Sequence, residues 1–183
     1  MSETGDTADG TAEGEDGRSY RGVLGTFPYA FRQSRSRLFR AYAVVGGLAA
    51  VLVTIAFILA VVVIIGATAD TTATLALSRS FVVFLGILVV VPILAPVLFV
   101  ARRHRRKTGD DVRYDRRLAV TGFVFLTSLY VGLIPTVPAE HQSDVDGVFG
   151  PVVTFLYDLP ATVGLAFPIL AAVLIYVVHR QSR

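Results

Sequence analysis

The chain has 183 residues, a net charge of +3 and 54% hydrophobic residues, with a mean hydropathy of +0.64. This composition is too apolar for an ordinary soluble domain and indicates a membrane protein. The absence of cysteine excludes a disulfide framework and a thiolate metal site. Most of the positive charge flanks apolar segments, so we interpret it as membrane anchoring and expect no nucleic-acid partner.

The first segment, residues 1–17, carries six acidic side chains and no Lys or Arg. Such a segment has too little apolar surface to offset its ordering entropy, which predicts a disordered acidic tail in the cytoplasm. It lacks the positively charged start of a signal peptide.

Residues 18–40 form a basic segment with six arginines. Four of its residues fall at helical spacing and form a stripe: Phe27, Phe31, Ser34 and Leu38. The stripe predicts a short amphipathic helix in the cytoplasmic interface, beginning near Thr26 with Pro28 in its first turn. The alternative is a basic linker without helical structure, which the stripe disfavours.

Four windows without charged residues follow, at Ala41 to Ala69, Ser80 to Ala101, Leu118 to Ala139 and Leu159 to Val178. Each reaches the roughly 20 residues that a membrane-spanning helix needs. None shows the polar alternation of a membrane barrel strand. We therefore predict an all-α integral membrane bundle over residues 41–183, with four helices at about 41–67, 80–101, 118–135 and 159–179.

Small residues recur four positions apart in two of these helices and favour close helix packing. The pairs are Ala43 with Gly47, Gly46 with Ala50, and Ser128 with Gly132. In the second helix, Pro92 and Pro96 each remove one backbone hydrogen bond, which predicts a kink. Such a kink acts as a gating hinge or as a static packing feature, and we favour the static role because membrane helices tolerate proline.

The last apolar segment, Val148 to Val178, is too long for one straight span and is interrupted by Asp158. We predict a break at Asp158, with this residue as N-cap and Pro160 in the first turn of the final helix. Gly150 to Tyr157 then forms a short outer segment, interfacial or partly re-entrant.

The distribution of charge predicts the topology. Sixteen Lys and Arg residues flank the helices on one side, and Arg79 is alone on the other. Basic loops stay in the cytoplasm, so we expect a multi-pass protein of the plasma membrane with both termini cytoplasmic. The central basic loop supplies the candidate contacts to anionic lipid headgroups: Arg102, Arg103, Arg105, Arg106 and Lys107.

Asp158 is the one acidic residue within the last apolar segment and is therefore the candidate for an intramembrane polar site, with Tyr157 and Thr154 as neighbours. A helix cap is favoured over a proton or ion relay, because Asp is a preferred N-cap residue near the end of a helix.

Other polar groups give weaker signals. The outer loop holds Glu140, His141, Asp144 and Asp146, ligand types that suit a divalent cation, but their spacing matches no metal motif. We interpret this loop as solvated and acidic. His104 is interpreted as an ordinary member of the basic loop. The acidic residues that follow it are expected to form exposed pairs with nearby arginines: Asp110, Asp111 and Asp115 with Arg113, Arg116 and Arg117. No phosphate loop or hydrolase motif is present, so the sequence predicts no catalytic residue, metal or cofactor.

The segment Gly25 to Ser34, followed by Leu38-Phe39-Arg40, resembles the start of small uncharacterised haloarchaeal membrane families. A single lysine beside sixteen arginines and the acidic tail agree with this resemblance. The resemblance covers the first third of the chain. It implies a membrane location and no assigned activity.

Two functional hypotheses follow. We favour a non-enzymatic structural or accessory subunit, whose partners are the anionic headgroups of the lipid bilayer and a membrane protein or a second copy. The alternative is a small oligomeric transporter or channel, which needs polar groups along its path. The candidate lining residues are Thr121, Thr127, Ser128, Tyr130 and Asp158.

Overall fold

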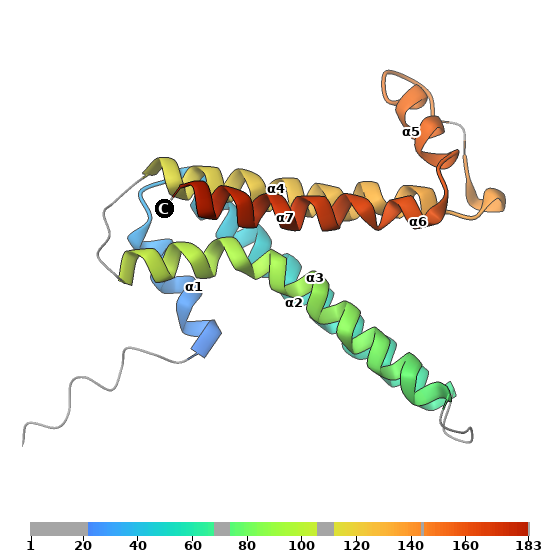
Figure 1. Cartoon of the computed structure of the whole chain (residues 1–183), viewed down its shortest axis with the longest axis horizontal. Helices are drawn as coiled ribbons and strands as arrows, with labels where there is room; N and C mark the ends of the chain where they lie inside the picture. The colour runs from blue at the N-terminus through green and yellow to red at the C-terminus, as the bar shows by residue number, and fades with distance from the viewer. Residues whose placement is uncertain (1–21, 68–73, 106–111, 144, 183) are drawn as a thin grey trace, which may run out of the picture.

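A computed structural model describes residues 22–67, 74–105, 112–143 and 145–182 (Figure 1). The helices are α1 (Gly22–Gln33), α2 (Arg37–Ala67), α3 (Thr74–Arg105), α4 (Val112–Leu133), α5 (Gly150–Tyr157), α6 (Ala161–Gly164) and α7 (Ala166–Gln181), with 3-10 turns η2 (Ile134–Thr136) and η3 (Ala139–His141). These residues contain no strand, which confirms the all-α class. The acidic tail lies outside the described residues.

Four helical stretches are long and apolar enough to cross a membrane. They are Arg37–Ala67, Ser78–Arg105, Val112–Thr136 and Ala161–Gln181. Each contains most of one predicted apolar window, so the prediction of a four-helix membrane bundle is confirmed. The helices α2 and α3 extend past those windows into flanking arginines, because a helix can continue where the charged side chains reach the interface.

The spans form two antiparallel pairs, α2 with α3 and α4 with α7 (Figure 1). The pairs meet where α2 begins and α3 ends, and they diverge toward the opposite side. We call the meeting side the basic end, defined by residues 34–40, 101–105, 112–118 and 179–182. The opposite side, which holds the end of α2, the start of α3 and α5, is the far end. The far part of the α2–α3 pair consequently has no helix of the α4–α7 pair beside it.

The divergence begins at a bend in the middle of α3, the region that contains Pro92 and Pro96 (Figure 1). This confirms the predicted kink. The backbone carbonyl of Ile93 lies between the two prolines and accepts a hydrogen bond of 2.7 Å from the Tyr42 hydroxyl. A buried side chain of α2 therefore contacts α3 at the bend.

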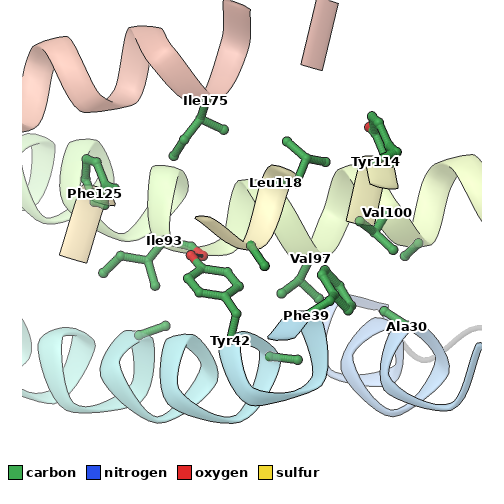
Figure 2. Close-up of a cluster of buried hydrophobic side chains, with 14 of the residues drawn as sticks. Ala30, Phe39, Tyr42, Ile93, Val97, Val100, Tyr114, Leu118, Phe125 and Ile175 are labelled. Atoms are coloured by element: carbon green, nitrogen blue, oxygen red, sulfur yellow. Dashed lines mark hydrogen bonds between the residues drawn. The ribbon is translucent and has the colours of Figure 1, made fainter. Parts of the chain in front are cut away.

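The core fills the space where the two pairs meet. Figure 2 shows Tyr42 of α2 pointing toward Ile93, with Val97, Leu118 and Ile175 around it. Tyr42 is fully buried, and its ring meets the Phe123 ring edge-on, with centroids 5.2 Å apart. Gly122 faces the same ring so closely that a Cβ there would overlap the Tyr42 side chain. Glycine is therefore required at 122 by the size of its neighbour.

The small-residue pairs predicted on α2 lie on its packed face. Ala43, Gly46 and Ala50 are buried, and a Cβ on Gly46 would come within 3.1 Å of the Tyr42 ring. The predicted pair on α4 is half right. Gly132 packs closely on the Gly164 backbone of α6, whereas the Ser128 hydroxyl donates back to its own helix, to the Phe125 carbonyl.

The basic amphipathic segment contains a helix, but its predicted start near Thr26 is wrong. α1 begins at Gly22, so Pro28 lies inside it. It packs on α3, with Ala30 fully buried and Phe31 exposed. The predicted stripe fails because the helix stops at Gln33 and α2 starts afresh at Arg37, where the Ser36 hydroxyl accepts a hydrogen bond from the Phe39 amide.

The break in the last apolar segment is confirmed, and the short helix α5 covers the predicted Gly150–Tyr157. The capping role of Asp158 is wrong. Asp158 directly follows α5, and the N-cap of α6 is Pro160, with no side-chain hydrogen bond. Asp158 lies two residues too early, because the first turn of α6 closes with the Val163 amide on the Pro160 carbonyl.

Candidate functional site

The described buried polar side chains gather mainly at the basic end. Ser34, Asp115 and His179 are each less than 9% exposed, and they come from the α1–α2 linker, α4 and α7. A buried polar group without a partner is costly, so the contacts of these residues indicate what the cluster does. They form two groups, one centred on Asp115 and one on His179.

The Asp115 carboxylate joins three elements. Its Oδ2 atom accepts a hydrogen bond of 2.6 Å from the Ser34 hydroxyl and lies 3.2 Å from His104 Nε2 at the end of α3. The side chains of His104 and Asp115 are only 5% and 3% exposed. Asp115 also sits in the first turn of α4, where the helix dipole favours a negative charge.

The order of these three groups decides their chemistry. A nucleophilic serine needs an imidazole beside its hydroxyl, with the carboxylate behind the imidazole. Here the carboxylate lies between Ser34 and His104, so the Ser34 hydroxyl donates to Asp115, and no imidazole of the described residues accepts from it. The geometry supports a structural junction between the linker, α3 and α4.

The second group surrounds His179 on α7. Its Nδ1 atom lies 2.6 Å from the Tyr114 hydroxyl, and its ring stacks on Phe99 with centroids 3.9 Å apart. The Arg103 guanidinium lies 4.2 Å from the centre of the Tyr114 ring, a cation–π arrangement. This group joins α3, α4 and α7.

The same Arg103 also holds the end of α7. Its Nη1 atom donates a 2.8 Å hydrogen bond to the carbonyl of Ser182, the C-cap residue of that helix. The last carbonyls of a helix have no partner within the helix, and a cation there also suits the dipole. The basic end therefore fixes the last turn of the chain's final helix.

The predicted headgroup residues have different surroundings. Arg102 is exposed, whereas Arg103 is occupied by Tyr114 and Ser182. Arg105 lies over the Tyr29 ring of α1, with its guanidinium 5.7 Å from the centroid. Arg106 and Lys107 lie outside the described residues.

The predicted polar site around Asp158 lies outside the four spanning stretches. Asp158 is exposed and Tyr157 is half-buried. The Asp158 amide donates to the Thr154 carbonyl, and the Thr154 hydroxyl donates to the Gly150 carbonyl, which are contacts within one short helix. The structure does not bring this set together with the polar cluster of the basic end.

The loop with Glu140, His141 and Asp146 is exposed where it is described. His141 Nδ1 lies 3.9 Å from Glu140 Oε1, and both side chains are about three-quarters exposed, at 72% and 76%. Asp144 lies outside the described residues. Among the residues that the structure places, no three acidic or imidazole side chains are arranged to hold a metal ion.

Sequence reasoning missed the cluster of the basic end. It treated His104 as an ordinary loop residue and Asp115 as part of an exposed pair, and both interpretations are wrong, since both side chains are buried. A signal was present. Asp115 falls at helical spacing with Leu118, Ala119 and Gly122, and His179 falls at the same spacing with Ala171 and Ile175.

Comparison with known proteins identifies a family. No curated protein and no solved structure matches the chain. A family model covers the whole sequence, beyond the first third in which the resemblance was noted. The chain belongs to the family described as Domain of unknown function (DUF8056), matched over residues 1–183.

Proposed function

We propose that the chain is a non-enzymatic structural or accessory protein of the membrane, whose basic end fixes the relative position of its four spanning helices. The observation that carries this proposal is the placement of the buried polar contacts. Ser34, His104 and Asp115 join three elements at one end, and Tyr114 and His179 join two spans beside them. The interior that follows is apolar around Tyr42. Such an arrangement holds helices in place and offers no polar route.

The transport alternative has less support from the described residues. The Thr121 hydroxyl donates to the Leu118 carbonyl, and the Ser128 hydroxyl donates to the Phe125 carbonyl. Thr127 is exposed, and Tyr130 is 71% exposed near the far end of α4. These groups satisfy their own helix or face outward, so they line no shared path through one copy, and the alternative requires a path between copies.

The orientation proposed is a cytoplasmic basic end, with both termini in the cytoplasm and the protein in the plasma membrane. Support comes from the charge distribution, in which Arg79 is the one basic residue predicted outside. Anionic headgroups are the expected partners of the basic end. A haloarchaeal origin and a membrane-protein partner stay predictions.

The native chain has no cysteine, so single-cysteine labelling can test this orientation cleanly. We would introduce Gln181→Cys at the basic end and Ser143→Cys in the loop between η3 and α5. Intact cells are then treated with a membrane-impermeant maleimide. Both positions are exposed. The variant at position 143 should label in intact cells, and the variant at position 181 only after lysis. The reverse pattern would contradict the topology.

The transport alternative is tested separately by reconstitution. Proteoliposomes that contain the purified protein should show the same ion and small-solute permeability as protein-free vesicles. Flux above that background that falls on Thr121→Val would instead support a transporter.

A further inference from the structure

An open cavity of about 440 Å³ lies between α4 and α7 at the basic end. Its lining has two chemical parts. Arg116, Arg117, Gln181 and Ser182 supply guanidinium, amide and hydroxyl groups, whereas Val120 and Val178 supply an apolar wall. Charged and apolar groups side by side are what an amphiphilic ligand requires.

The cavity lies where the charged end of the two helices passes into their apolar stretch. Val120 is 47% exposed, and one helical turn further into the span Val124 and Leu174 are 42% and 40% exposed. Residues four apart lie on the same face of a helix, so these side chains extend the apolar wall from the cavity into the bilayer region.

The arginines of the cavity are available to a ligand. Within the described chain, Arg116 has no hydrogen-bond or ion-pair partner, and Arg117 makes one long contact, 3.5 Å from Nη1 to the Ser182 hydroxyl. Both side chains are exposed. By contrast, Arg103 is held by the Tyr114 ring and the Ser182 carbonyl. The basic end therefore contains an arginine with a structural role, Arg103, and two arginines that are accessible to a ligand, Arg116 and Arg117.

We propose that this cavity binds one anionic phospholipid, with the phosphodiester between the guanidinium groups of Arg116 and Arg117 and an acyl chain along Val120 and Val124. Guanidinium groups pair well with phosphate because their N–H donors match its oxygens in pairs. This inference rests on the proposed membrane function and the cytoplasmic basic end. It places specific headgroup recognition on α4 and α7, away from the central loop in which the sequence predicted it.

A free phosphate ion offers the same oxygens to the same arginines. The apolar wall favours the lipid, because an inorganic ion gains nothing from Val120 and Val178. The test therefore titrates the purified full-length protein, in a non-ionic detergent, with three probes: short-chain phosphatidylglycerol, short-chain phosphatidylcholine and inorganic phosphate. Native mass spectrometry counts the molecules bound to each protein.

We expect one phosphatidylglycerol molecule to bind at least about tenfold more tightly than phosphatidylcholine or phosphate. The double variant Arg116→Gln with Arg117→Gln should weaken that binding at least about tenfold. The matched control is Arg102→Gln with Arg180→Gln, which removes the same charge from two exposed positions outside the cavity and should weaken binding less than about threefold.

A third variant keeps the positive charge and removes the paired N–H donors of the guanidinium groups. Arg116→Lys with Arg117→Lys should bind more weakly than the native protein and more tightly than the glutamine pair. The proposal is overturned if the two glutamine double variants weaken binding equally, because that result would mean diffuse charge attraction. It is also overturned if inorganic phosphate binds as tightly as the lipid. Either result combined with the expected cysteine labelling would reject the lipid site and leave the proposed membrane function intact.

Discussion

The basic half of the bundle and the far half of the α2–α3 pair differ in how they are stabilised. In the basic half, side chains such as Tyr42, Leu118 and Val97 are fully buried among three or four helices. In the far half, Val63 and Phe84 are 68% and 61% exposed. In the most apolar stretch of 18 residues in α2, only 6% of the residues are buried. In the corresponding stretch of α4, 39% are buried.

The far half is held by contacts between its own two helices. Gly86 of α3 faces Phe57 of α2, with a hypothetical Cβ 3.0 Å from that ring. Beside them runs an apolar groove of about 410 Å³ that includes Val61 and Val90. In water such a surface would aggregate, whereas in lipid it costs little. The comparison teaches that the fold is specified near one membrane face, and that the remaining hairpin needs only to be helical and apolar.

The sharpest test of this contrast makes the same substitution in each half. Gly122→Ala should lower the free energy of unfolding by about 3 kcal/mol, because the new methyl group overlaps Tyr42. Gly66→Ala, at a site with nothing within 4 Å, should leave it unchanged or slightly raise it. Unfolding by SDS in mixed micelles measures both. Equal losses would mean that packing matters as much at the far end.

Removing the central carboxylate of the basic end should have the next largest effect. Asp115→Ala leaves the Ser34 hydroxyl without its acceptor and His104 without its buried carboxylate partner, which should cost about 2 kcal/mol. Asp115→Asn keeps one acceptor oxygen and should cost less. Thermal melting in detergent compares the two variants. A melting temperature like that of the native protein in both would show that the junction does not stabilise the fold.

The contact between α4 and α7 should contribute less. Tyr114→Phe removes the hydroxyl that lies 2.6 Å from His179 Nδ1 and keeps the ring under Arg103, so we expect a loss of about 1 kcal/mol. Tyr130→Phe is the matched control, because that side chain is 71% exposed. If the control lowers stability as much, the hydroxyl of Tyr114 has no special role in joining the helices.

The smallest effect is expected at the sequence-predicted polar site. Asp158→Asn changes an exposed side chain at a position that is not the N-cap of α6, so the melting temperature and the permeability of proteoliposomes should both stay as in the native protein. A change in permeability with unchanged stability would restore the relay hypothesis for Asp158.

The sequence was informative where one short-range property decides the structure. Charge-free windows located the spans, and Asp158 with Pro160 located the break after α5. The bend at Pro92 and Pro96 followed from the missing backbone donors. Each of these features depends on residues within a turn or two of each other.

The candidate site depends on contacts that sequence spacing does not encode. Ser34 and Asp115 are 81 residues apart, and Tyr114 and His179 are 65 apart. Helical periodicity can place Asp115 on the buried face of α4, but it does not reveal which group meets that carboxylate. The packing of α1 on α3, which buries Ala30, was not predicted for a related reason, since the sequence does not say which helix lies beside α1.

Because Tyr42 lies near the start of α2, the tilt of the helix at this residue decides the position of its other end. Tyr42 lies in the second turn of α2, and the 25 residues from it to Ala67 measure about 37 Å at 1.5 Å per residue. A rotation of about 5° about that ring therefore moves the tip of the hairpin by about 3 Å. The packing of Gly46 and Gly122 on Tyr42 therefore limits how far the α2–α3 pair can tilt at its other end.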